Sequence, residues 1–435
     1  MFDRFTDYQV ATVTLGDMSI EDVAPVFERI NSTGTPLTIV DLMRAATWKP
    51  TFDLVDSIDR LSASLEPKQF DAIDRKTLLR AIASAAGHGF DSASIDDLRH
   101  RSKEDLLAAV NAVEAAAKRT SDFLATEIGV PGARALPYVN QFAVLCELFR
   151  QLPSPTSKQY DQVIRWFWRT TLGSYFGGWN TGQMTADRDA VTAFANGDTS
   201  SIQTSASAPA ASIWSTRDFR SNSATSKMMA LMLGQKKPVD LITGQAIDVA
   251  KALAWNNDKE FHHFFPRGFL KSTNIAKKTN VIANIVMLTS MSNIRIRDRA
   301  PSEYLRSISQ TVGEGVLRSR LRSCMVPEAA YEAALADDYM GFLAARSSHL
   351  QEEALRLAGL DDPDARLFLS SLVMRFRRGP RCCAISRRTV SAAPSGRNDE
   401  RPVIFDRPFC AGSADQGLCV SVLAGRRSLR AGWST

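Results

Sequence analysis

The 435 residues are enough for two or three domains, and 44% hydrophobic and 23% charged residues are ordinary proportions for a globular protein. The sequence has no apolar run of about 18 residues and no apolar segment after Met1, so we expect a cytoplasmic protein without membrane helix or secretory signal. The net charge of +6 is compatible with a polyanionic partner, and the six cysteines, with no C-x-x-C spacing, are expected to be free thiols.

The first predicted element is a strand over residues 8–18, where apolar and polar residues alternate. Ser19 and Asp22 form a capping pattern before a helix whose apolar positions recur at helical spacing as far as Ile30. Gly34 ends this helix, and Thr38 is expected to cap the next one, over residues 39–48.

The segment Val26-Phe-Glu-Arg-Ile-Asn-Ser-Thr-Gly-Thr-Pro-Leu-Thr-Ile-Val-Asp-Leu42 resembles a motif of GmrSD-type modification-dependent restriction endonucleases. That motif lies in their ParB/sulfiredoxin-like N-terminal domain, which precedes a helical region and a C-terminal HNH nuclease domain. The resemblance implies a nucleotide-binding α/β unit, assigned here to residues 1–60. The family's upstream Asp-Gly-Gln-Gln-Arg segment is absent, so we expect the unit to be truncated.

Three residues of this segment are candidate contacts to a nucleoside triphosphate, since an Arg and a polar loop beside a helix end can bind phosphate. They are Arg29, Asn31 and Thr35. The alternative interpretation is structural: Asn31 caps the helix and Gly34 makes the turn.

Residues 61–235 are predicted to be helical. Ser102-Lys-Glu-Asp105 is a capping box that opens a long Ala-rich helix. A later helix, over residues 160–176, carries Trp166, Phe167 and Trp168 and is expected to end at Gly177. These aromatic residues are predicted to be core, with stacking on nucleic-acid bases as the alternative.

Residues 236–360 contain the pattern most closely tied to chemistry. Glu260-Phe-His-His-Phe-Phe-Pro-Arg267 reads as a short strand that ends at Pro266, and Asn284-Ile-Val-Met-Leu288 reads as the next strand. Asn293 follows nine positions after Asn284, before a helix expected through residues 301–305. A neutral imidazole can bind a metal or accept a proton near pH 7, so two adjacent histidines at a strand end could serve both roles.

This order resembles the HNH, or ββα-metal, nucleases. By resemblance, His263 is the general base, Asn284 fixes the loop and orients the base, and His262 and Asn293 bind Mg²⁺ or Mn²⁺. Many members have Asp at the position of His262 and His at that of Asn293, so the resulting site is neutral and expected to be weaker for Mg²⁺. The alternative is a pair of core histidines beside a buried Asn.

Charged residues flank the proposed site. Glu260 lies two positions before His262 and could orient it as a neighbouring carboxylate; an exposed strand-end charge is the alternative. Candidate contacts to DNA phosphates are the basic residues on both sides, with ordinary solvated charge as the alternative. They are Lys277, Lys278, Arg295 and Arg297.

Residues 361–435 change in composition towards Arg, Ser, Gly and Cys and lose all periodicity. We expect a disordered or aberrantly translated tail there, with a basic nucleic-acid-binding arm as the alternative.

The sequence therefore predicts a mainly α protein with a truncated α/β N-terminal unit, a helical middle and a ββα-metal finger near the C-terminal third. The expected function is metal-dependent cleavage of foreign or base-modified DNA, as in phage defence. DNA is the expected partner, and either a homo-oligomer or a partner that supplies the missing N-terminal part is left open. The alternatives are a non-catalytic DNA-binding or regulatory protein and an inactive remnant of such an enzyme.

Overall fold

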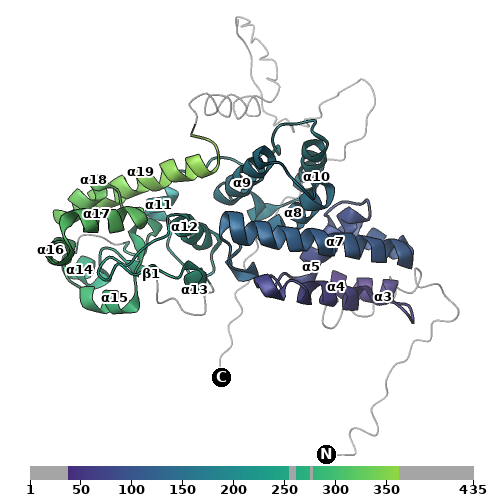
Figure 1. Cartoon of the computed structure of the whole chain (residues 1–435), viewed down its shortest axis with the longest axis horizontal. Coiled ribbons are helices and arrows are strands. Elements are labelled where there is room, and N and C mark those ends of the chain that lie inside the picture. Colours follow the sequence, from purple (N-terminus) through teal and green to yellow (C-terminus); the bar gives the residue numbers. More distant parts are fainter. Residues whose placement is uncertain (1–37, 254–260, 275–277, 362–435) are drawn as a thin grey trace, which may run out of the picture. The chain divides into compact units, whose positions relative to one another are not determined.

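The chain is mainly helical in the computed structural model, which describes residues 38–253, 261–274 and 278–361 (Figure 1). The predictions for the N-terminal strand and helix, for Glu260 and Lys277, and for the tail lie outside these residues. No helix in the described ranges is long and apolar enough to cross a membrane.

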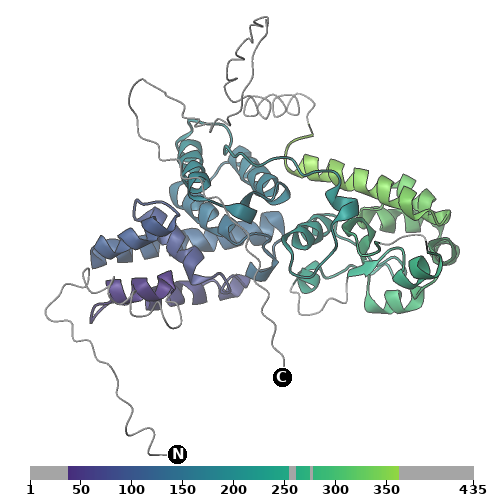
Figure 2. The same cartoon turned by 180° about the vertical axis from the view of Figure 1, so that it is seen from behind.

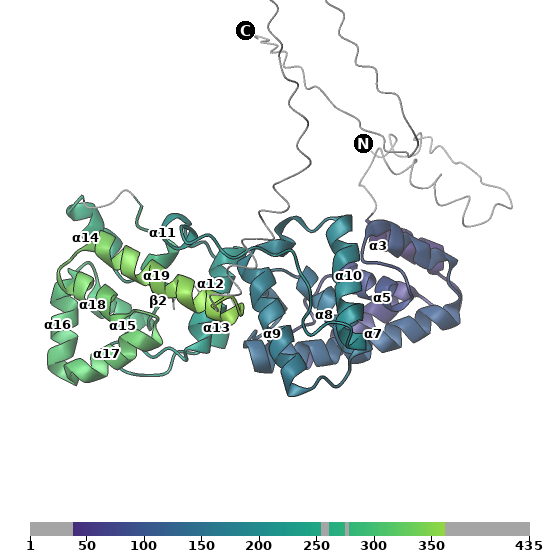
Figure 3. The ribbon, with the colours of Figure 1, turned by 90° about the horizontal axis from the view of Figure 1, so that it is seen from above.

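Eight helices form the first part of the described chain. They are α3 (Ile39–Thr47), α4 (Leu54–Ala63), α5 (Arg75–Ala85), α6 (Ser92–Asp96), α7 (Lys103–Phe123), α8 (Asn140–Gln151), α9 (Ser157–Leu172) and α10 (Thr181–Asn196). Helix α7 packs along α8 and α5, as Figures 1 and 3 show from two directions. Helix α4 continues through residue 60, where the sequence placed a domain boundary.

Two of the three helix starts predicted from capping residues are confirmed, and the third, at Ser19, lies outside the described residues. The Thr38 hydroxyl accepts a hydrogen bond from the Asp41 amide at the start of α3, and the Asp41 carboxylate in return accepts one from the Thr38 amide. Ser102 caps α7 by accepting from the amide of Asp105, which is one of the two bonds of the predicted capping box. Each cap satisfies a backbone N–H that has no partner within the helix, which is why these residues mark where the helices begin.

The aromatic residues of α9 are core, as predicted: Trp166, Phe167 and Trp168 are buried. The helix ends at Leu172 rather than at Phe176, because Gly173 and Ser174 turn the chain, the latter with a φ of 53°. A 3-10 turn, η5 (Tyr175–Gly178), occupies the stretch that the sequence assigned to the helix.

The second part of the chain contains a two-stranded antiparallel sheet among helices (Figures 1 and 2). Its elements are α11 (Ile213–Thr216), α12 (Ala224–Gln235), α13 (Val249–Leu253), β1 (Phe261–His263), α14 (Arg267–Ser272), η7 (Ile282–Asn284), β2 (Ile285–Met287), α15 (Ser290–Ile296), α16 (Pro301–Val312), α17 (Glu314–Ser323), α18 (Glu328–Leu335) and α19 (Tyr339–Leu357). The segment after Pro238 forms an isolated antiparallel bridge between Val239 and Ala246.

Helix α19 holds this part together. It packs against α18 and α11, and its Arg346 is completely buried. The Arg346 guanidinium donates to the carbonyls of Ala283, Cys324 and Met325 at 2.9, 3.1 and 3.2 Å. Burial lowers the pKa of Arg346 to about 10, so the guanidinium stays charged at neutral pH. Its bond to the Ala283 carbonyl fixes the turn before β2.

Candidate functional site

The two histidines and the second asparagine lie on one pocket. Strands β1 and β2 pair with His262 opposite Val286 and His263 opposite Ile285, and α15 follows β2. His262, His263 and Asn293 all line a pocket of about 470 Å³. Adjacent side chains of a regular strand point to opposite faces. Both histidines nevertheless line the same pocket, where β1 ends at His263.

The ring of His263 is held by an asparagine that the sequence analysis did not identify. His263 Nε2 lies 2.9 Å from Asn280 Oδ1, while Asn280 Nδ2 donates to the carbonyl of Phe219 at 2.7 Å. Because the side-chain nitrogen of Asn280 donates to the Phe219 carbonyl, the side-chain oxygen of Asn280 faces the imidazole and accepts from Nε2–H. In the neutral ring Nδ1 then carries the lone pair.

The environment of His263 favours the neutral, basic form. Burial lowers the pKa of His263, the nearby Arg267 guanidinium lowers it further, and the hydrogen bond with Asn280 opposes both. An imidazole that is neutral at pH 7 can accept a proton from water, which is what a general base must do.

Asn284 fixes the chain between the strands. It is completely buried, and its Oδ1 accepts from the Phe265 amide at 2.8 Å. Its Nδ2 donates to the carbonyls of Phe265 and Thr279 at 3.1 and 2.9 Å. Asn284 lies in η7, immediately before β2, and clamps the residues that follow His263 to those that precede Asn280. Its contact with the base is therefore indirect, through these two segments.

Asn293 lies within α15, whereas the sequence placed it before the helix. Buried Asp240 anchors the N-terminus of this helix. One carboxylate oxygen accepts from the Thr289 amide at 2.8 Å and the other from the Ser292 hydroxyl at 2.6 Å. A carboxylate is stabilised at a helix N-terminus by the unpaired amides and the helix dipole. Burial raises the pKa of Asp240, but hydrogen bonds from Ser292, Thr243 and Thr289 outweigh it and lower the pKa below the usual value.

The rim of the pocket brings together opposite charges. Arg267 and Arg297 line it, and Asp298 lies between α14 and the end of α15. Asp298 Oδ1 accepts from the Gly268 amide at 3.0 Å. A Cβ at Gly268 would lie 2.1 Å from the Asp298 carboxyl carbon, so glycine is what allows this approach. Arg297 has a φ of 52°, a backbone conformation that costs energy in a side-chain-bearing residue.

The other predicted contacts lie outside the pocket or outside the described residues. Arg295 is exposed on α15, and Lys278 is exposed with its Nζ 3.4 Å from the carbonyl of Thr216. The remaining candidates, Arg29, Asn31, Thr35, Glu260 and Lys277, are not among the described residues.

The pocket is lined by side chains of types that can donate to a divalent ion. Among the described residues no three His, Cys, Asp or Glu side chains are grouped to hold a metal. His262, Asn293 and Asp298 offer an imidazole, an amide oxygen and a carboxylate on one pocket. Mixed nitrogen and oxygen donors suit Mn²⁺ better than Mg²⁺, which prefers oxygen.

Three residues of the site were therefore missed from the sequence: Asn280, Asp240 and Asp298. Asp240 had a usable signal, since Asp-x-x-Thr in Asp240-Leu-Ile-Thr243 is the pattern of a side chain that bonds the backbone ahead of it. Asn280 and Asp298 had none, because their contacts with His263 and Gly268 span 17 and 30 positions of the chain.

No protein-family model matches the chain. An uncharacterized protein of Methanocaldococcus jannaschii is 22% identical over 320 residues, which cover 69% of this chain and 53% of that protein. The chain thus spans about half the length of the curated relative that it matches. This similarity carries no assignment of activity.

Proposed function

We propose that the chain is a metal-dependent DNA endonuclease of the HNH type, related to the GmrSD-type restriction enzymes and directed at foreign or base-modified DNA. The observation that carries the proposal is the single pocket lined by His262, His263 and Asn293, built from β1 and from α15 after β2. Two basic side chains, Arg267 and Arg297, line the same pocket, where a phosphodiester would need positive charge.

In this proposal His263 is the base. Asn280 accepts from Nε2–H and so leaves Nδ1 to take the proton of the attacking water. Arg267 and Arg297 hold the phosphate oxygens through charge-assisted hydrogen bonds. His262, Asn293 and Asp298 would hold the divalent ion, which when bound supplies positive charge to the phosphate and the leaving oxygen.

The test is cleavage of plain and base-modified supercoiled plasmid with Mn²⁺, with Mg²⁺ and with a chelator. The donor set predicts cleavage that needs metal, at lower concentrations of Mn²⁺ than of Mg²⁺. In His262→Ala the metal concentration for half-maximal cleavage should rise. Binding of either plasmid with no cleavage under any metal would contradict the proposal and favour a DNA-binding or regulatory protein.

A further inference from the structure

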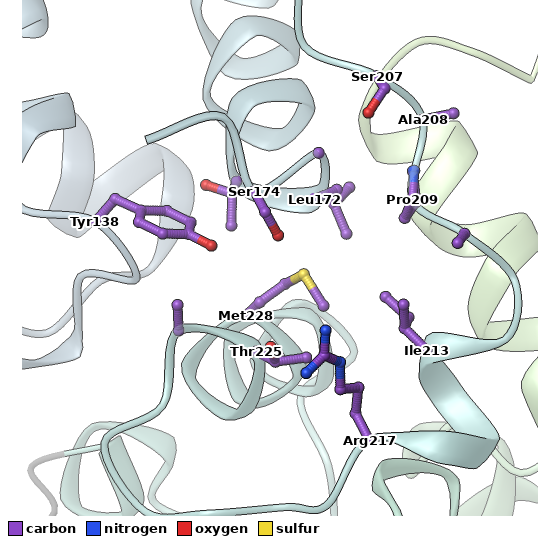
Figure 4. Close-up of a pocket in the computed structure, with 14 residues that line it drawn as sticks. Tyr138, Leu172, Ser174, Ser207, Ala208, Pro209, Ile213, Arg217, Thr225 and Met228 are labelled. Atoms are coloured by element: carbon purple, nitrogen blue, oxygen red, sulfur yellow. The ribbon is translucent and has the colours of Figure 1, made fainter. Parts of the chain in front are cut away.

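A second pocket, of about 370 Å³, lies between the end of α9 and the segment that runs through α11 into α12. It shares no lining residue with the histidine pocket. Figure 4 shows the Arg217 guanidinium, the Tyr138 hydroxyl and Ser174 converging on the same space. Among the described residues that line it, Arg217 is the only charged one, and none is a carboxylate.

The walls of this pocket are fixed by specific contacts. A Cβ at Gly173 would lie 2.4 Å from the carbonyl oxygen of Ser207, so glycine lets the 207–210 segment cross the end of α9. On the other side Trp214 Nε1 donates to Gln351 Oε1 at 2.8 Å, and Gln351 Nε2 donates to the carbonyl of Pro209 at 3.0 Å. The cavity is therefore built into the fold, which lowers the cost of ordering a ligand there.

The chemistry of the lining suits an anionic group on a small carbon body. The Arg217 side chain makes no hydrogen bond or ion pair with any described residue, and the Ser174, Thr225 and Tyr138 hydroxyls can donate beside it. A phosphate monoester has three terminal oxygens for such donors, more than a carboxylate offers. Leu172, Ile213 and Met228 add apolar surface to the lining, with Met228 beside the Arg217 guanidinium (Figure 4).

We propose that this pocket binds a small phosphate monoester, held by the Arg217 guanidinium and the neighbouring hydroxyls. The phosphate could belong to a free metabolite or to the 5′ end of a DNA strand, and the two sources share this chemistry.

The residues next to Arg217 lead directly to the proposed base. The carbonyl of Arg217 accepts from the Ile282 amide at 3.0 Å, and Asp218 bridges Val281. Phe219 then pairs with Asn280 twice, through its amide and through its carbonyl, at 2.7 Å each. A ligand that binds Arg217 and shifts its backbone would therefore shift residues 280–282, which hold the Asn280 side chain against His263. This coupling rests on the nuclease function proposed above, whereas the binding does not.

Binding is tested by calorimetry on the full chain with adenosine 5′-monophosphate, glucose 6-phosphate and adenosine. A short single strand with a 5′ phosphate, and the same strand without it, identify the source. The phosphorylated probes should bind and adenosine should not. Arg217→Gln should weaken binding at least about tenfold, the usual worth of a charge-assisted contact. Arg220→Gln is the control, since Arg220 is exposed but does not line the pocket.

Binding of adenosine as tight as that of its monophosphate, equal affinity in Arg217→Gln, or no binding at millimolar concentration would each overturn the proposal. Coupling is read from the ¹⁵N NMR shifts of His263, one of five histidines in the chain. Saturating ligand should change the His263 signals in the wild type and not in Arg217→Gln. Unchanged signals in the presence of bound ligand would contradict the coupling alone, and neither measurement depends on DNA cleavage.

Discussion

Among single residues, Asn284 has the most exacting set of partners. Asn284→Ala would leave one amide and two carbonyls of the buried loop unpaired, which should cost about 2–4 kcal/mol of unfolding free energy. Asn284→Asp has the same shape but would place a carboxylate oxygen against the carbonyls of Phe265 and Thr279. We expect it to be at least as destabilising as the alanine at pH 7, in urea unfolding followed by circular dichroism.

The aspartate variant should recover part of this loss at low pH, where its protonated carboxyl can donate to one of the carbonyls. Asn274→Asp is the matched control, because Asn274 is exposed and has a φ of 51°, which Asp also tolerates. Wild-type stability of Asn284→Asp at pH 7 would show that the amide does not face the two carbonyls.

Arg267 is predicted to set the pH below which the rate of cleavage falls. Burial, followed by the charge of Arg267, lowers the pKa of His263. A base with a lowered pKa remains neutral at more acidic pH, so the rate should begin to fall only below the usual histidine pKa of about 6.5. Arg267→Gln removes a positive charge, raises the pKa of His263 and should move this limb of the pH–rate profile to higher pH.

The midpoint of the profile is the readout, since Arg267→Gln also removes a phosphate contact and lowers the rate at every pH. Arg295→Gln is the control because Arg295 is exposed on α15 and does not line the pocket. An unmoved midpoint in Arg267→Gln, or an equal shift in the control, would show that Arg267 does not tune the base.

At the scale of elements, the position of α15 depends on Asp240. Its carboxylate accepts from Thr289 and Ser292 at the start of the helix that carries Asn293. In Asp240→Asn the side-chain nitrogen would face either the Thr289 donors or the Ser292 hydroxyl. This clash of donors should lower the free energy of unfolding by about 2–4 kcal/mol. Metal-dependent cleavage should then need more metal, because Asn293 loses a fixed position.

Asp248→Asn provides the comparison. Asp248 is exposed and accepts from the Lys251 amide at 3.0 Å, and Asn caps a helix as well as Asp does. We expect Asp248→Asn to leave unfolding and metal requirement nearly unchanged. If Asp240→Asn matched it in both measurements, the carboxylate would not be the anchor of α15.

At the scale of the whole molecule, the sequence predicted those features that depend on neighbours in the chain. Thr38 and Ser102 mark helix starts and the aromatic residues of α9 are core, because caps and helical periodicity act over a few residues. The predicted end of α9 was wrong because Gly173 and Ser174 turn the chain within an otherwise helical sequence pattern.

In the candidate site, too, the sequence predicted some residues and not those whose partners lie far away in the chain. The resemblance to HNH nucleases implied that His262, His263 and Asn293 belong together, and they line one pocket. Asn280 and Asp298 were out of reach because tertiary structure brings their partners to them, and the local Asp240–Thr243 signal gives no indication of the contact between Asp240 and Ser292. Asp240 meets Ser292 across 52 positions, and a single sequence contains no record of such a contact.

The proposed nuclease activity depends above all on His263 as its general base. The most direct measurement is the initial rate of plasmid cleavage in Mn²⁺ for wild type, His263→Ala and His100→Ala, the last an exposed histidine outside the pocket. We predict that His263→Ala loses at least about a hundredfold in rate while still unfolding cooperatively, and that His100→Ala cleaves normally. Equal cleavage by all three proteins would contradict the account.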